Sequence, residues 1–197
     1  TMLLGTALVG MVLGLHLGSV RRQRLVKVRI HELGGSYFCD WGLPVSEDIV
    51  PNCLEHVLGE DHFQTVNHVN LSGTGVSDDQ LEFLDDLPRL ETLYLEDGTE
   101  VTDAGLRHLV EIDSLRNLYL PDTITDEGLT VLANMPQLET LILSDSEVTD
   151  AGIECLSRLT NLKWIYLDGT GVTLEGAKRL KQHLPDIRIT YIFGELT

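Results

Sequence analysis

A spaced set of apolar residues, L-x-x-L-x-L, recurs about every 24 residues along this chain of 197 residues. Five copies start at residues 66, 90, 115, 138 and 162, and a degenerate sixth covers 187–192. The copies end, 23 to 25 residues apart, at Leu71, Leu95, Leu120, Leu143, Leu167 and Ile192. So regular a period is typical of a solenoid, in which each repeat packs on the repeats beside it.

A second block follows each of the first five copies, and its clearest form is V-T-D-A-G-L. Its hydroxyl residue suits a helix N-cap, and the acid after it suits the positive end of a helix. The hydroxyls are Ser77, Thr102, Thr125, Thr149 and Thr173, and the acids are Asp78, Asp103, Asp126 and Asp150. We therefore interpret these acids as helix caps rather than as calcium ligands or catalytic groups.

Strand and helix thus alternate, which predicts an α/β fold: a right-handed β-α superhelix of about five repeats over residues 66–193, with a tail at 194–197. The combination of L-x-x-L-x-L with V-T-D-A-G-L resembles bacterial leucine-rich repeat proteins, near the cysteine-containing class. That class has Cys or Asn in a column after the strand, where this chain has Thr74, Thr99, Thr123, Ser146 and Thr170. The resemblance implies protein–protein recognition on the concave sheet and no enzymatic activity.

The segment from Met2 to Val20 contains no charged residue, and a basic stretch beginning at Arg21 follows it directly. A helix of this length is roughly 28 Å long, close to the thickness of a bilayer core. We predict a transmembrane anchor at residues 1–20; a cleaved signal peptide and a buried core helix are the alternatives. An apolar anchor, the run R-R-Q-R and a helix ending Leu-Gly-Gly also look like membrane-anchored members of the same bacterial family.

The basic stretch predicts a single-pass topology with the repeats on the cytoplasmic side. Within the anchor, Gly10, Gly14 and Gly18 lie on one helix face. This spacing lets two membrane helices pack closely, although glycine is also common in membrane helices that do not associate.

Residues 21–65 predict a basic juxtamembrane helix and an N-terminal cap. The helix continues over 21–33, an alternating stretch at 37–41 predicts a strand, and apolar residues at helical spacing predict a further helix over 46–58.

Charge divides the chain into a basic N-terminal part and an acidic remainder. Residues 1–35 hold five basic residues and one acid, whereas residues 36–197 hold nine basic and thirty acidic residues, a net charge of −21. So acidic a body repels phosphates, which excludes nucleic acid as a partner and favours a basic protein or peptide.

No motif of an enzyme or of a metal site is present. The three cysteines, an odd number without metal-like spacing, exclude a disulfide scaffold and a zinc ribbon. There is no glycine-rich phosphate loop, nucleophile elbow or H-E-x-x-H, and the histidines are scattered. We expect no catalytic residue, no metal and no cofactor.

A column of tyrosines marks the expected binding face. The residue between the last two apolar positions of each repeat points to solvent on the concave sheet, which gives Asn70, Tyr94, Tyr119, Ile142, Tyr166 and Tyr191. The neighbouring column contains His68, Thr92, Asn117, Thr140, Trp164 and Ile189. Tyrosine and tryptophan are frequent at binding hot spots, but stacked tyrosines also serve only to stabilise a sheet.

Two functions follow. The first is a membrane-anchored interaction module that binds a protein or peptide on the concave face. The second is a structural module that self-associates through the glycine row of the anchor or through an open strand edge after Ile192.

Overall fold

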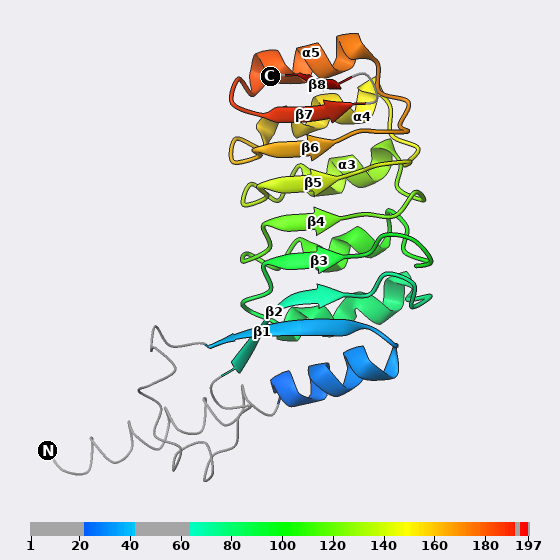
Figure 1. Cartoon of the computed structure of the whole chain (residues 1–197), viewed down its shortest axis with the longest axis vertical. Coiled ribbons are helices and arrows are strands. Elements are labelled where there is room, and N and C mark those ends of the chain that lie inside the picture. Colours follow the sequence, from blue (N-terminus) through cyan, green and yellow to red (C-terminus); the bar gives the residue numbers. More distant parts are fainter. Residues whose placement is uncertain (1–21, 42–63, 192–193, 197) are drawn as a thin grey trace, which may run out of the picture.

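The computed structural model describes residues 22–41, 64–191 and 194–196. Eight strands form one sheet in the order of the sequence, with the helical segments stacked along one side of it (Figure 1). The strands are β1 (Ser36–Trp41), β2 (Gln64–Asn70), β3 (Thr92–Tyr94), β4 (Asn117–Tyr119), β5 (Thr140–Ile142), β6 (Trp164–Tyr166), β7 (Arg188–Tyr191) and β8 (Gly194–Leu196). The predicted α/β solenoid is therefore confirmed.

The six middle strands are parallel because each repeat returns through a helical segment before the next strand begins. One residue of each strand points into the stack, and these residues are fully buried: Val69, Leu93, Leu118, Leu141, Ile165 and Ile189. The leucines that flank each strand complete one continuous core.

The helical segments differ along the stack. They are the 3-10 helices η2 (Asp78–Asp86), η3 (Gly105–Leu109) and η4 (Leu156–Arg158), and the α-helices α3 (Asp126–Leu132), α4 (Asp150–Cys155) and α5 (Leu174–His183). In the first repeat the buried residues recur every third position, at 81, 84, 87 and 90, which suits the three residues per turn of a 3-10 helix. In the last repeat they stand at 177, 180, 184 and 187, and there α5 is the longest helical segment of the repeats.

Four of the five predicted N-cap hydroxyls are confirmed, whereas the prediction for Thr102 is wrong because η3 begins only at Gly105, with Ala104 as its N-cap. Thr125 accepts a hydrogen bond from the backbone N–H of Glu127, and Thr149 and Thr173 accept the equivalent bonds in α4 and α5. Ser77 shares a capping box with Gln80.

The aspartates of the second block have a role that the cap interpretation did not include. Asp126 accepts hydrogen bonds from both the backbone N–H and the hydroxyl of Thr149 in the next repeat, at 2.8 and 2.6 Å. Asp78, Asp103 and Asp150 bond Thr102, Thr125 and Thr173 in the same way. We call these four Asp–Thr pairs the ladder.

Each ladder aspartate also explains the glycine of the block. A Cβ atom at Gly152 would lie 2.2 Å from Oδ1 of Asp126, and Gly105, Gly128 and Gly176 are equally close to the other three aspartates. The motif T-D-x-G therefore repeats because the carboxylate of one repeat occupies the space beside the glycine of the next.

Both ends of the ladder depart from the motif. At the start, Gln80 replaces the glycine, and its Oε1 accepts the Ser77 N–H at 3.0 Å, the donor that an aspartate serves elsewhere. At the end, Leu174 stands in the aspartate position. The next strand, β7, is followed by the antiparallel β8 instead of another helical segment, and the Leu174 side chain is 47% exposed.

The N-terminal cap closes the stack with a helix at residues 22–32 and with β1, as predicted. Val26 and Ile30 of this helix join the core. The turn into β1 passes close to the end of β2, and a glycine is needed at position 35 because a Cβ atom there would lie 2.7 Å from the Asn70 carbonyl oxygen. β1 pairs antiparallel with β2, which begins at Gln64, two residues before the predicted boundary.

Three predictions lie outside the described residues: the anchor at 1–20, its glycine row and the helix over 46–58. Among the residues that the structure does describe, no helix combines the length and apolar character needed to cross a membrane.

The predicted open strand edge at the C-terminus is wrong. The segment expected to be a tail contains β8, which pairs antiparallel with β7 from Ile189 to Tyr191. An antiparallel strand thus covers each end of the parallel sheet, and three residues suffice because β7 itself has only four.

Candidate functional site

The concave face is the side of the sheet opposite the helical segments (Figure 1). The register between neighbouring strands decides which side chains share a column on it. Asn70, Tyr94, Tyr119, Ile142 and Tyr166 are consecutive partners and form the first column, as predicted. The second column contains Phe38, His68, Thr92, Asn117, Thr140, Trp164 and Arg188.

Two members of the predicted columns are wrong, because the last copy of the repeat is shifted by one residue. Tyr166 pairs with Thr190 rather than with Tyr191, and Trp164 pairs with Arg188 rather than with Ile189. Tyr191 packs partly against the core, and its hydroxyl donates to the Val172 carbonyl oxygen at 2.8 Å. Tyr191 is therefore a structural residue of the last repeat.

Tyr94 and Tyr119 form the central aromatic pair of the face. Their rings stack with centroids 4.2 Å apart and an angle of 29° between their planes. Burial, and then the neighbouring Tyr94, raise the pKa of Tyr119, so the phenol stays protonated well above neutral pH. Both side chains remain partly exposed, which leaves two hydroxyl groups and two aromatic edges for a partner.

A second aromatic group lies at the C-terminal end of the face. The guanidinium of Arg188 stands over the Trp164 ring, 4.4 Å from its centroid. Such an arrangement holds a cation beside an aromatic surface at little cost in entropy. Arg188 was not predicted, because the spacing of the degenerate copy places its residues one position too late.

A third aromatic group, formed by Phe38 with His68, extends the face onto the cap. Phe38 is 69% exposed and packs edge-to-face against His68, with ring centroids 6.5 Å apart. The strand at 37–41 was predicted, but its antiparallel pairing with β2 leaves no periodic signal in the sequence. Phe38 was therefore missed.

Other predicted members contribute less to a binding surface. The Asn70 side chain accepts the Ser72 N–H at 2.9 Å and so shapes the turn after β2. Ile142 lies between Tyr119 and Tyr166 in the register and is only 8% exposed. Thr92 is 3% exposed and accepts a hydrogen bond from Asn117.

The loops that follow the strands form an acidic rim beside the face. The five loops over 71–78, 95–103, 120–126, 143–150 and 167–173 contain no lysine or arginine. Four of their acids belong to the ladder, which leaves Glu96, Asp97, Glu100, Asp122, Asp145, Glu147 and Asp168. Burial and the adjacent Asp97 raise the pKa of Glu96, as expected where negative charge accumulates.

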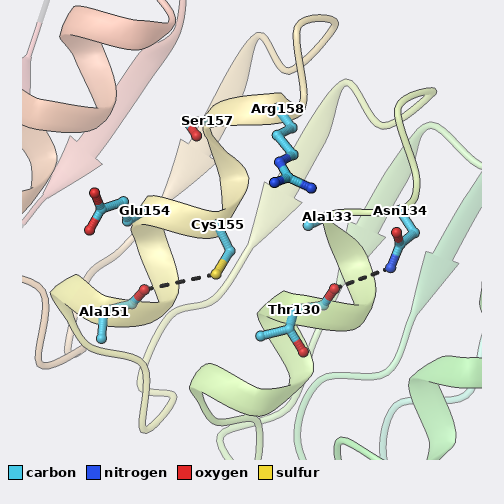
Figure 2. A pocket seen from close by; sticks show the side chains of 8 residues that line it. All are labelled: Thr130, Ala133, Asn134, Ala151, Glu154, Cys155, Ser157 and Arg158. Atoms are coloured by element: carbon cyan, nitrogen blue, oxygen red, sulfur yellow. Dashed lines mark hydrogen bonds between the residues drawn. The ribbon is translucent and has the colours of Figure 1, made fainter.

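A hollow on the helical side was not predicted. It has a volume of about 400 Å³ between α3 and the α4–η4 segment, and Figure 2 shows Cys155 and Arg158 from one side and Asn134 from the other pointing toward it. The Cys155 sulfur is directed at the Ala151 carbonyl oxygen, 4.0 Å away, within its own helix.

Comparisons with known proteins agree with this geometry. A family model described as leucine-rich repeat matches residues 134–157, from the end of α3 to η4. Residues 134–157 thus match a leucine-rich repeat, and the other copies share their spacing. The structure is similar to internalin C2 of Listeria monocytogenes, with a TM-score of 0.50 and 18% identity over 71% of each chain, which supports the fold alone.

Two further similarities are partial. A second internalin of Listeria monocytogenes is 21% identical over 56% of this chain and 30% of its own, with a TM-score of 0.45. Human tubulin-specific chaperone E is 29% identical over 107 residues, which is 51% of this chain and 20% of that protein. The chain thus spans a fifth of the length of this relative, and a bacterial origin stays a prediction.

Proposed function

We propose that this protein is a membrane-anchored, non-enzymatic interaction module that binds a basic protein or peptide on the concave face of its leucine-rich repeats. Recognition of proteins is the general role of leucine-rich repeat domains. The observation that carries the proposal is the stacked and partly exposed pair Tyr94–Tyr119 at the centre of the face. Aromatic side chains that are already ordered lose little entropy when they bind.

The expected partner is basic because the acidic rim adjoins this aromatic surface. The repeats offer carboxylates on one side, and Trp164 with Arg188 at the end, so cations of the partner would lie over the rim and its apolar side chains over the tyrosines. The proposal includes the membrane anchor and the cytoplasmic side of the repeats as the sequence predicts them. It also includes association of the anchor through Gly10, Gly14 and Gly18.

The experiment is site-specific photocrosslinking in cells that make the protein. A photoreactive phenylalanine at position 119 is expected to capture a partner. One at position 154, beside the hollow on the helical side, is the matched control. Capture at position 119 alone, lost on Tyr94→Ala with Tyr166→Ala, supports the concave site. Equal capture at both positions, or capture only of a second copy, would reject it.

A further inference from the structure

The helix at residues 22–32 has two faces of opposite character. One face packs on the repeat stack through Val26 and Ile30, with Gln23 and Lys27 also buried. The other face is exposed and carries Arg22, Arg24, Leu25, Val28, Arg29, His31 and Glu32. The inner face of the helix is therefore already packed on the repeats, and its outer face is available for a second contact.

The outer face exposes two apolar side chains that nothing in the described part of the chain covers. Leu25 is 63% exposed and Val28 is 50% exposed. At about 100° per residue they form a stripe, with Arg24 on one side and Arg22 and Arg29 on the other. Glu32 continues the stripe one turn beyond Val28, where Arg29 lies 3.5 Å from its carboxylate. Apolar residues flanked by long cations are typical of helices that lie in the headgroup region of a membrane.

The charges of this face are only weakly satisfied within the protein. Arg22 lies 3.9 Å from Asp86, and Arg29 lies 3.5 Å from Glu32, and all four side chains are exposed. Exposed pairs of this kind contribute little, so the guanidinium groups remain available to phosphates. Arg24 has no ion pair among the described residues.

Apart from the contact of Arg22 with Asp86 of η2, the position of the helix separates these cations from the acidic rim. It lies at the N-terminal end of the stack, beyond β1 (Figure 1). Its buried face is turned toward the repeats, so the outer face points away from them. With strands about 4.8 Å apart, the acidic loop after β3 is already about one Debye length beyond β1. An anionic surface would attract the helix while the repulsion from the rim is largely screened.

From this geometry we propose that the outer face of helix 22–32 rests on anionic lipid headgroups. The arginines bind lipid phosphates, Leu25 and Val28 enter the interface, and the repeats stand upright on the bilayer. This inference rests on the membrane anchoring of the proposed function, because the helix directly follows the predicted anchor. It adds a second, lipid-specific contact and fixes the direction in which the concave face is presented.

The test uses the full chain reconstituted into vesicles of phosphatidylcholine alone or with added phosphatidylserine. A fluorophore is attached through Val28→Cys after Cys39, Cys53 and Cys155 are changed to Ser, and lipids carrying a quencher near the headgroup report contact. Quenching is expected with phosphatidylserine and much less without it. The matched probe, attached through Lys178→Cys on exposed α5 at the far end of the stack, is expected to show none in either vesicle.

Charge variants make the test specific. Each arginine at an anionic surface raises the equilibrium constant for membrane contact about fivefold. Arg24→Gln with Arg29→Gln should therefore lower the ratio of membrane-bound to membrane-free helix roughly 25-fold. The control, Arg107→Gln with Lys178→Gln, removes the same charge from exposed positions of the repeats and should leave quenching unchanged. Hydrogen exchange of residues 22–32 in the unlabelled natural chain, slower with phosphatidylserine, checks that the label does not create the contact.

Several results would overturn the inference: equal quenching in both vesicles, no effect of the arginine pair, or a probe at position 28 shielded without lipid quenching. The last result would mean that residues 42–63 of the chain, or another protein segment, cover the stripe. Flotation with phosphatidylcholine vesicles at high salt tests the anchor separately. A chain that floats without quenching keeps the anchor and loses the headgroup contact, whereas a chain that fails to float loses the anchor itself.

Discussion

On the ladder and on the concave face, the same repeats use their side chains in opposite ways. Each ladder aspartate is bonded to the next repeat, and its residue type barely varies because the threonine and glycine beside it fit only that carboxylate. The residue type varies along the first column of the concave face, because backbone hydrogen bonds rather than side-chain hydrogen bonds join its strands. The column contains Asn70, Tyr94, Tyr119, Ile142, Tyr166 and Thr190. In this solenoid strict repetition marks structure, and the variable column is the one that we propose for recognition.

The largest expected effect tests the ladder. Gly152→Ala should lower the free energy of unfolding by about 2–4 kcal/mol, because the new Cβ displaces the Asp126 carboxylate, only 2.2 Å away, from Thr149. In an unconstrained helix the same change would instead be favourable by about 1 kcal/mol. Urea unfolding measures the sign directly.

A double-mutant cycle serves as the control for Gly152→Ala. Removing the carboxylate with Asp126→Ala opens the space that the new methyl group needs, so the double variant should lose less stability than the sum of the single variants. Additive losses would mean that the glycine and the aspartate act independently, and the explanation of the T-D-x-G motif would fail.

The next effect separates recognition from stability. Tyr119→Ala should weaken binding of the crosslinked partner by about 2 kcal/mol, or roughly 30-fold, and cost less than about 1 kcal/mol of stability, because its ring stacks on one neighbour at the surface. Titration calorimetry and urea unfolding measure the two quantities.

Tyr191→Phe provides the reverse pattern. It removes the hydrogen bond to the Val172 carbonyl oxygen and should cost about 1 kcal/mol of stability without changing affinity. If Tyr119→Ala destabilised the fold and spared binding, the tyrosine column would be only sheet packing.

A smaller effect tests where the ladder ends. Asp126→Leu should cost about 1–2 kcal/mol, since the Thr149 N–H and hydroxyl lose their acceptor. The opposite exchange, Leu174→Asp, should change stability by less than about 0.5 kcal/mol, because Leu174 is exposed and the antiparallel β8, rather than a strand and threonine of the same motif, follows β7. Thermal and urea unfolding measure both changes in stability. If they were equal in size and opposite in sign, the carboxylate would matter only within its own helix.

These contrasts also explain what the sequence could predict. The repeats, the strand at 37–41 and the first five members of the tyrosine column follow from periodic spacing, since every leucine in L-x-x-L-x-L is buried for the same reason. The ladder was within reach as well: an acid and a glycine that recur at one period imply a contact between repeats. Read one repeat at a time, the same aspartates look like ordinary helix caps.

The parts that could not be predicted are those without a repeating neighbour. Arg188 takes the place expected for Ile189, and Thr190 the place expected for Tyr191, because β7 is followed by an antiparallel strand and the last copy is degenerate. Phe38 reaches the concave face by an antiparallel pairing that one strand of sequence does not reveal, and β8 closes the sheet with residues too few to show a pattern. At both ends of a solenoid, tertiary pairing replaces periodicity as the determinant of structure.

The smallest effect is a difference in the pH dependence of the two regions. Burial acts to raise the pKa of Asp150, but hydrogen bonds from Thr173 and the charge of Arg179 outweigh it and lower the pKa below the ordinary 3.8. The stability that this carboxylate contributes is therefore complete above pH 3.8 and lost as the pH falls further. Glu96, on the acidic rim, has its pKa raised above 4.5 by burial and by Asp97, so its ionised form destabilises the fold near neutral pH and this penalty disappears on mild acidification.

Two variants isolate these contributions in urea unfolding at several pH values. Asp150→Asn should lower stability at pH 7, and its difference from the unaltered chain should vanish in strong acid. Glu96→Gln should raise stability at pH 7 by a few tenths of a kcal/mol, with no gain below pH 4.5. Asp150 is already stabilised in its charged form by Thr173 and Arg179, whereas Glu96 has no such cation beside it in the proposed site. A bound basic partner should therefore remove the penalty of ionised Glu96 and leave the contribution of Asp150 to stability unchanged. The same pH profile for both acids, with or without that partner, would remove the distinction between the two regions.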